Sequence, residues 1–394
     1  MASSSSAATD KSLAGLSIAV KSTTALLQKF EHAIVNPSKD APRNPSASQS
    51  QAPTEPLALL HTSATLAKAQ TTKLSLLILN KPFSPTAIST ILRDLSTGPL
   101  AVMMSAAEVC TPEVWGKTMS AEVKLRVLHV LRELRGLMGN IPLSPAAVDG
   151  TDKEDNSLPA SRDPLATTGG VWEACDSLAD LHDKGVAGLL VQRAQQYRDT
   201  LEDAIAELTE WSQASEADSH SDEEDEDSDA ADARSNNEED GFDDLFSSSN
   251  ALPKGDSVLR SLVEISLKRL ALVKMLYSGL IKRRLPHVSL PVSINQSNGS
   301  ESASASSSHS SALRITRIDQ LLESLKAIPE ETDELASAFY ELDEEDVKTR
   351  LEKCLALARN AAESTRTDRN DEEDEFTKWL DKWLVMIDKE RIEK

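Results

Sequence analysis

The residue types best suited to metal binding or nucleophilic chemistry are sparse in this sequence. It contains seven histidines and three cysteines, and none of them falls into the spacing of a known metal-binding motif. Cys110, Cys175 and Cys354 each lie on an apolar stretch of a predicted helix, so we expect buried thiols. The sequence also lacks a Gly-rich phosphate loop, a nucleophile elbow and a kinase signature. We therefore predict a protein that is not an enzyme, with no catalytic residues, no cofactor and no metal.

The densest chemical feature is an acidic tract, residues 216–246. It holds fifteen Asp or Glu and a single basic residue, Arg234, and so carries −14 of the chain's net charge of −22. The rest of the chain carries only −8. Such a run of like charges repels itself and stays hydrated, which predicts a disordered insert at residues 214–255. The acidic balance also disfavours direct nucleic-acid binding, since phosphate neutralisation needs clustered Lys and Arg.

Three interpretations of the acidic tract stay open. It could be a solubilising insert without a partner. It could be a phosphorylation switch, because Ser215, Ser219 and Ser221 each have an acidic residue three positions on, as acid-directed kinases prefer. It could also be a short motif that docks into a partner's groove. The residues of that motif are Phe242, Asp243, Asp244, Leu245 and Phe246.

Apolar residues recur at helical spacing along the chain, and no strand-like alternation bounded by hairpin turns appears. Proline marks the joins: Asn36-Pro37 ends the first helix, Pro85 and Pro112 open two others, and Gly98-Pro99 must kink or split a helix. The predicted helices cover about residues 11–35, 56–80, 84–110, 111–138, 184–213, 256–285, 312–328, 343–363 and 371–392, with shorter pieces at 171–181 and 333–342. Lys282, Arg283 and Arg284 end one helix, where they match its dipole or form a short nuclear import signal.

These elements predict an all-α fold of two antiparallel helix bundles joined by disordered linkers. We expect a disordered N-terminus at 1–10, an N-terminal bundle at 11–140, a linker at 141–169 and a C-terminal bundle at 170–394 that carries the acidic insert. The acidic tract is the alternative boundary. No signal-peptide core and no apolar run of about 18 residues occurs, so we expect a soluble protein of a reducing compartment with no membrane partner.

The order of these features resembles the cyclin-D-interacting protein family, also called GCIP or cyclin-D-binding protein. The acidic tract matches in position, and the resemblance covers most of residues 11–394. The motifs that carry it are short and none is catalytic. They are Thr71-Thr72-Lys73-Leu74 followed by Lys81-Pro82-Phe83-Ser84-Pro85, then Val171-Trp172-Glu173-Ala174-Cys175, and Asp333-Glu334-Leu335-Ala336-Ser337-Ala338-Phe339-Tyr340.

This resemblance implies helical bundles akin to the rod modules of talin and vinculin. It also implies a regulatory protein that binds cyclins or helix-loop-helix factors in the cytoplasm and nucleus, and that restrains cell-cycle progression and transcription. Gly98-Pro99 and the Ser- and Pro-rich inserts at 37–55 and 293–311 depart from the family pattern. An alternative function is a cytoskeletal adaptor of the talin or vinculin type. The sequence names neither the partner nor the oligomeric state.

Overall fold

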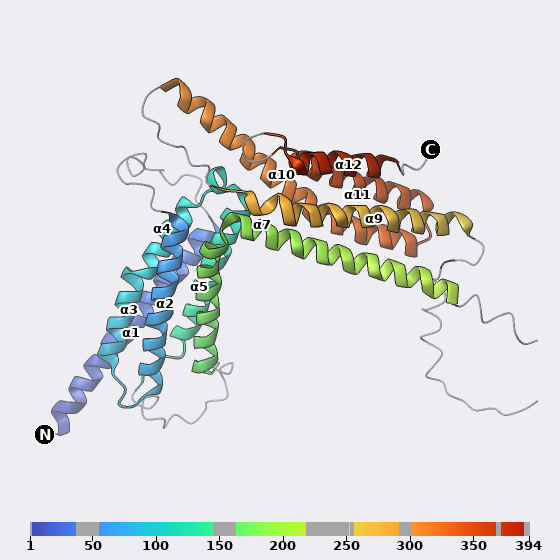
Figure 1. Ribbon diagram of the computed structural model, residues 1–394. Coiled ribbons are helices and arrows are strands. Elements are labelled where there is room, and N and C mark those ends of the chain that lie inside the picture. Colours follow the sequence, from blue (N-terminus) through green and yellow to red (C-terminus); the bar gives the residue numbers. More distant parts are fainter. Residues whose placement is uncertain are drawn as a thin grey trace, which may run out of the picture. The chain divides into compact units, whose positions relative to one another are not determined.

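Every regular element that the computed structural model describes is a helix (Figure 1). The structure describes residues 2–36, 55–144, 163–217, 252, 256–290, 301–367 and 372–389. No strand occurs within these ranges, which confirms the all-α class predicted from the sequence. The chain divides into two compact units, unit 1 at Met1–Val186 and unit 2 at Ala187–Lys394.

Within its described residues, unit 1 contains five helices and the first part of a sixth. In it α1 packs against α3 and α5, and α2 packs against α3 and α4 (Figure 1). Leucine, valine and methionine side chains from all of these helices fill the core. The helices are α1 (Ala2–Val35), α2 (Pro56–Leu79), α3 (Pro85–Thr97), α4 (Pro99–Val109), α5 (Pro112–Met138) and α7 (Pro164–Ala217).

Proline sets the start of four helices in unit 1, as the sequence predicts. Pro56, Pro85, Pro99 and Pro112 each stand in the first turn, where a missing backbone N–H removes no helical hydrogen bond. The split at Gly98-Pro99 is confirmed, because α3 ends at Thr97 and α4 begins at Pro99. The residues before Pro85 and Pro112 make no side-chain cap hydrogen bond.

Two helices extend into segments that the sequence marks as polar linkers. α1 begins at Ala2 and so includes residues 2–10, and α10 (Glu301–Tyr340) includes residues 301–311. Both segments are rich in Ser and Ala and contain neither Gly nor Pro. Ala has the highest helix propensity, so a backbone without a breaker continues the helix that follows it.

The helical backbone of α7 is interrupted at Gly185, where φ is 59° and ψ is −167°. That backbone region is reached almost only by glycine, because a Cβ would clash there. The sequence predicts separate helices at 171–181 and 184–213, and Gly185 lies in the first turn of the second. The division between the units falls one residue later, between Val186 and Ala187.

The boundary between the units differs from the predicted linker at 141–169. Residues 164–184 pack with unit 1, because they make polar contacts to α2 and α5. The Ser75 and Thr168 hydroxyls lie 2.6 Å apart, and Arg126 donates to the Ser177 carbonyl at 2.5 Å. Tertiary contacts, and not the polar composition of residues 141–169, therefore decide where unit 1 ends.

The described residues of unit 2 form the second part of α7 and four further α-helices. In it α10 and α11 lie side by side, and α9 packs against α11 and α12 (Figure 1). The Asp256 side chain accepts hydrogen bonds from the backbone N–H groups of Val258 and Leu259 and so caps the N-terminus of α9. The elements are α9 (Ser257–Arg283), the short 3-10 helix η2 (Leu285–His287), α10 (Glu301–Tyr340), α11 (Glu344–Ser364) and α12 (Glu375–Lys389).

The prediction that a helix ends at Ile328 was wrong, because α10 continues through Pro329 to Tyr340. Proline at position 329 cannot donate to the carbonyl of Leu325 four residues earlier. The buried Tyr277 hydroxyl of α9 donates to that carbonyl instead, at 2.5 Å. A tertiary hydrogen bond thus replaces the missing helical one, and the helix persists.

Candidate functional site

The candidate site residues of the acidic tract fall mostly outside the described ranges. Phe242, Leu245 and Phe246, with the two aspartates between them, lie there, and so do Ser219 and Ser221. Ser215 lies near the C-terminal end of α7. The docking motif and the phosphorylation sites therefore stay predictions.

The three cysteines are buried, as the sequence predicts. Burial raises the pKa of the thiols of Cys110, Cys175 and Cys354 to about 12. Each thiol is therefore protonated at neutral pH, and a protonated thiol is a poor nucleophile. The cysteines thus serve as small apolar core residues.

Histidine contacts are present in unit 1 but do not assemble a metal site among the described residues. The rings of His61 and His182 lie 5.2 Å apart, and His182 Nδ1 is 3.2 Å from the carboxylate of Asp183. His129 approaches Glu133, one helical turn on, at 3.8 Å. No group of three or more His, Cys, Asp or Glu within the described ranges could hold a metal ion. In the same part of the chain, no helix is long and apolar enough to cross a membrane.

An exposed apolar strip lies along α2 and the first part of α7. These helices run antiparallel, since Lys68 pairs with Asp176 at 2.6 Å, and the hydroxyl pair of Ser75 and Thr168 lies later on α2 but earlier on α7. Four apolar side chains are exposed next to this seam. They are Leu76 (54%), Leu79 (46%), Leu165 (60%) and Trp172 (39%), which we call the α2–α7 strip.

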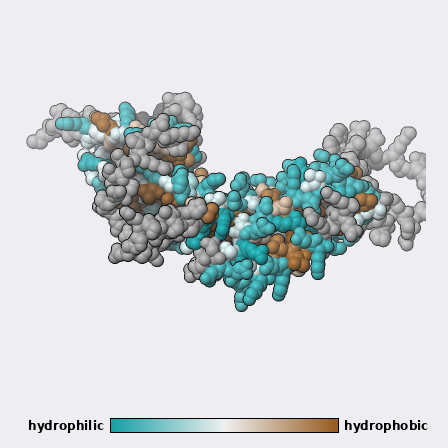
Figure 2. Space-filling view, turned by 90° about the horizontal axis from the view of Figure 1, so that it is seen from above, coloured by the Kyte–Doolittle hydropathy of each residue, from teal (hydrophilic) through white to brown (hydrophobic). Residues whose placement is uncertain are grey.

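Helical periodicity places these four side chains on one side of the seam. Leu74 and Val171, on the opposite side, are fully buried in the core of unit 1. Leu79 lies one turn beyond Ser75, and Leu165 lies nearly one turn before Thr168, so antiparallel packing brings them to the same level. Separate apolar patches between hydrophilic residues are also visible on the face of the molecule that Figure 2 presents. Exposed apolar groups that adjoin one another are typical of a binding surface.

Trp172 belongs to one of the motifs quoted above, Val171 to Cys175. Val171, Ala174 and Cys175 are buried, so core packing accounts for these three positions. The core does not account for Trp172, because its side chain is 39% exposed. Tryptophan is enriched among the residues that dominate binding energy at protein interfaces. The sequence motif indicates the segment from Val171 to Cys175. Only the structure shows that Trp172 is its exposed position.

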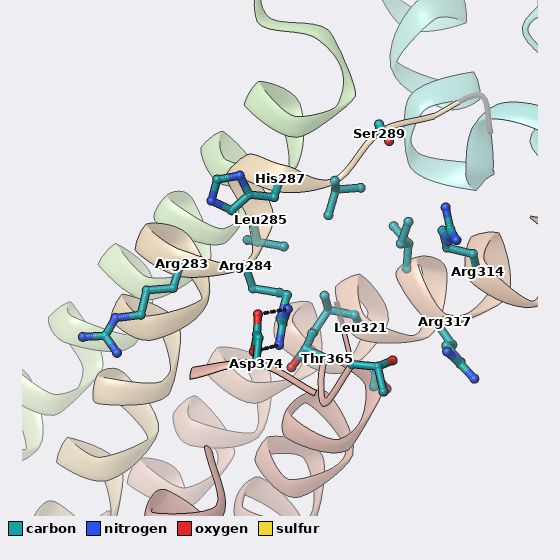
Figure 3. Close-up of a pocket in the computed structure, with 14 residues that line it drawn as sticks. Arg283, Arg284, Leu285, His287, Ser289, Arg314, Arg317, Leu321, Thr365 and Asp374 are labelled. Atoms are coloured by element: carbon teal, nitrogen blue, oxygen red, sulfur yellow. Dashed lines mark hydrogen bonds and ion pairs between the residues drawn. The ribbon is translucent and has the colours of Figure 1, made fainter. Parts of the chain in front are cut away.

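A second candidate is a cavity of about 320 Å³ in unit 2, which we call the basic pocket. It lies between the C-terminal end of α9, η2, the Arg314–Leu321 part of α10 and the end of α11 (Figure 3). Among the described residues, four arginines, a histidine and the carboxylate of Asp374 line it. The basic residues are Arg283, Arg284, His287, Arg314 and Arg317.

The Arg284 guanidinium forms a fixed wall of the basic pocket. It donates from both terminal nitrogens to the Asp374 carboxylate, each at 3.0 Å, and lies over the Phe376 ring, 4.5 Å from its centroid. Arg284 is only 8% exposed, so this third residue of the basic run Lys282 to Arg284 is not free to act as an import signal. Its pairing with Asp374, ninety residues later, could not be found from the sequence.

The Asp374 carboxyl is held in its charged form. Burial by itself raises its pKa, but the hydrogen bond from the Thr377 backbone N–H and the Arg284 guanidinium outweigh burial and lower the pKa. The pair therefore stays ionised at neutral pH.

Comparison with known proteins finds one family model and one relative that match this chain. Residues 59–214 match a protein-family model described as Grap2 and cyclin-D-interacting, N-terminal. The uncharacterized protein C22E12.18 of Schizosaccharomyces pombe is 22% identical over 329 residues, which cover 84% of this chain and 83% of the yeast protein. No solved structure matches this chain. The match of residues 59–214 to the N-terminal model of the Grap2 and cyclin-D-interacting family supports the resemblance found in the sequence.

Proposed function

We propose that this protein is a non-enzymatic regulatory protein that binds a cyclin or a helix-loop-helix factor and so restrains cell-cycle progression or transcription. The observation that carries the proposal is the family match of residues 59–214, whose description names cyclin-D interaction. The buried, protonated cysteines agree with a binding role, since they leave no activated thiol. Such a protein acts by occupying a surface of its partner in the cytoplasm or nucleus.

The α2–α7 strip is the surface that we assign to the partner. All four of its residues lie inside the region of the family match. A short apolar strip flanked by polar residues has the composition of an interface core with its rim. The Lys68–Asp176 pair beside the strip is exposed and supplies polar groups to that rim. We propose that Trp172 inserts into an apolar pocket of the partner.

The test is the affinity of the purified full chain for a purified D-type cyclin and for a purified helix-loop-helix protein, measured by biolayer interferometry. The variant that combines Leu165→Asp with Trp172→Ala should weaken binding by tenfold or more, roughly 1.4 kcal/mol. Val109→Asp is the matched control, because Val109 is 57% exposed on α4 and lies outside the strip. Circular dichroism should show unchanged helix content in both variants.

The acidic tract supplies the competing location for the same function. Replacing Phe242, Leu245 and Phe246 together by Ala should leave binding intact if the α2–α7 strip is the site. Loss of binding in that variant, with the strip variant unaffected, would move the site to the tract. No binding of either partner class to the intact chain would contradict the proposed function.

We also propose that each unit is an antiparallel bundle of the talin and vinculin type. The lengthwise packing of α1 with α3, of α2 with α4 and of α10 with α11 supports this arrangement. A cytoskeletal adaptor is the corresponding alternative function. Co-sedimentation with actin filaments, in the absence of binding to cyclin or helix-loop-helix proteins, would favour that alternative.

A further inference from the structure

Helix α12 packs against α9 and α11 of unit 2 (Figure 1). We call the surface of α9 and α11 that lies beneath it the α9–α11 groove. The apolar side chains that α12 buries follow one another at steps of four, three and four residues, which places them on one side of the helix. They are Phe376, Leu380, Trp383 and Ile387.

The α9–α11 groove receives two tryptophans of α12. Gly279 of α9 lies directly beneath Trp379, because a Cβ at position 279 would come within 2.5 Å of the ring. Trp383 is fully buried, and its indole N–H donates to the Leu272 carbonyl of α9 at 2.8 Å. A buried tryptophan whose N–H is satisfied is the kind of anchor that dominates the binding of a helix in a groove.

Aspartates recur at every seventh residue along one edge of α12. Asp374, Asp381 and Asp388 each pair with an arginine outside α12. Seven residues make nearly two helical turns, so the three carboxylates lie in one row and set the level at which α12 sits in the α9–α11 groove. Their partners are Arg284 at the end of α9 (3.0 Å), Arg366 just after α11 (2.9 Å) and Arg359 within α11 (3.1 Å).

The α9–α11 groove is positively charged when α12 is left out. Four arginines lie along it, the three partners of α12 and Arg269 of α9. Within the described residues, α9 and α11 supply one carboxylate to these arginines, that of Glu352, which lies 3.2 Å from Arg269 and 4.0 Å from Arg359. The other carboxylates that pair with them come from α12 and the segment just before it. An acidic amphipathic helix is therefore the complementary occupant of the groove.

The groove arginines are not fully satisfied while α12 occupies the groove. Arg269 is fully buried, and of its three nitrogens Nη1 is bonded to Glu352, whereas Nε and Nη2 make no hydrogen bond within the described residues. The Nη2 atom of Arg359 is likewise buried and unbonded in the described part of the chain. Buried guanidinium donors without acceptors cost free energy. A helix that brings a further carboxylate close to Arg269 would satisfy donors that α12 leaves unpaired.

We propose that the α9–α11 groove is a second binding surface, which accepts an acidic amphipathic helix of a partner protein in place of α12. Residues 365–374 join α12 to α11, and every other described helix of unit 2 precedes them, so the exchange of α12 separates none of the others. In this arrangement α12 is an internal competitor that closes the groove until the partner helix is present. The groove lies outside residues 59–214 of the family match, so the proposal does not depend on cyclin binding.

The test uses the full chain and a fluorescein-labelled peptide of residues 372–389, whose binding is followed by fluorescence polarisation. The peptide carries the pattern of α12 and stands for the partner helix. It should bind to the natural chain, and roughly tenfold or more tightly to Trp383→Ala, because the chain's own α12 has then lost its anchor. The same substitution in the peptide should weaken binding by a similar factor. One change thus has opposite effects in the chain and in the peptide.

Matched controls separate binding in the groove from unspecific association. Val385→Ala, at a position of α12 that is 54% exposed, should leave the affinity unchanged in the chain and in the peptide. A peptide that combines Asp374→Asn, Asp381→Asn and Asp388→Asn should bind roughly tenfold less tightly at low salt, and this difference should shrink at high salt. Circular dichroism should show that Trp383→Ala keeps its helix content. If that variant does not fold, Trp383→Phe, which loses the indole N–H, should show a smaller change in the same direction.

Four outcomes would overturn the inference. Absence of binding to the natural chain would mean that α12 does not yield the groove. Equal affinity for the natural chain and for the tryptophan variant would mean that the peptide binds elsewhere. Equal affinity of the aspartate and asparagine peptides would mean that the arginines do not read the carboxylates. A dimer of the natural chain in light scattering, dissociated by the peptide, would assign the groove to α12 of a second copy and not to a partner protein.

Discussion

The Tyr277 hydroxyl donates to the Leu325 carbonyl at 2.5 Å, and this is the carbonyl that Pro329 leaves without its helical donor. Both groups are buried in unit 2. Burial, the largest cause, raises the pKa of Tyr277 far above its usual value, so the hydroxyl keeps its proton and remains a donor. A side chain from α9 therefore completes the backbone hydrogen bonding of α10.

Removing this hydroxyl should destabilise unit 2. In Tyr277→Phe the Leu325 carbonyl stays buried without a partner, which costs about 1–3 kcal/mol. The loss should appear as a lower midpoint in urea unfolding followed by circular dichroism. In the Pro329→Ala background the backbone N–H of residue 329 can donate to Leu325, so Tyr277→Phe should cost clearly less. An equal cost in both backgrounds would show that the hydroxyl does not compensate for the proline.

Gly279 is required by the close approach of Trp379. A Cβ on Gly279 would lie 2.5 Å from the Trp379 ring, so Gly279→Ala forces α9 and α12 apart and should destabilise the protein by roughly 1–3 kcal/mol. Gly136→Ala is the control, because nothing lies within 4 Å of its Cβ, and it should be neutral or stabilising by up to about 1 kcal/mol. Adding Trp379→Phe to Gly279→Ala should recover part of the loss, because the smaller ring makes room. Thermal unfolding of the natural protein, of Gly279→Ala, of Gly136→Ala and of Gly279→Ala with Trp379→Phe tests this prediction.

Gly185 carries the backbone strain at the break in α7. Its φ of 59° with ψ of −167° is accessible almost only to glycine, so Gly185→Ala should cost about 1–3 kcal/mol although the space around its Cβ is open. Gly169→Ala, in the helical part of the same element with similar open space, should cost nothing. Equal unfolding midpoints for these two variants would contradict the backbone explanation.

The Arg284–Asp374 pair should make stability depend on pH in the acid range. The pKa of Asp374 is lowered in the folded state from its usual value of 3.8. The unfolded state therefore binds more protons in this window, so the stabilisation is complete above pH 3.8 and is lost as the pH falls through the folded-state pKa. The difference in free energy of unfolding between the natural protein and Asp374→Asn should be constant near neutral pH and shrink below pH 3.8. Asp381→Asn, which breaks an exposed pair with Arg366, should change little at any pH.

The sequence by itself determines most helix boundaries, because they depend on local chemistry. Proline fixes the starts of α2, α3, α4 and α5, Gly98-Pro99 separates α3 from α4, and the Asp256 side chain caps α9. The burial of the three cysteines also follows from their apolar helical surroundings. These features involve residues within a turn or two of one another, which a pattern in the sequence can report.

Only the tertiary structure decides the features that join distant residues. The local sequence predicts that a helix ends before Pro329, yet α10 continues. The hydroxyl of Tyr277, fifty-two residues earlier in the chain, supplies the hydrogen bond that proline cannot make. Arg284 belongs by its position to a basic helix end, yet Asp374 and Phe376 bury it as a wall of the basic pocket. The α2–α7 strip likewise exists only because the contacts of Lys68 and Ser75 bring two separate segments together. Such contacts depend on packing in three dimensions, and no spacing along the chain encodes them.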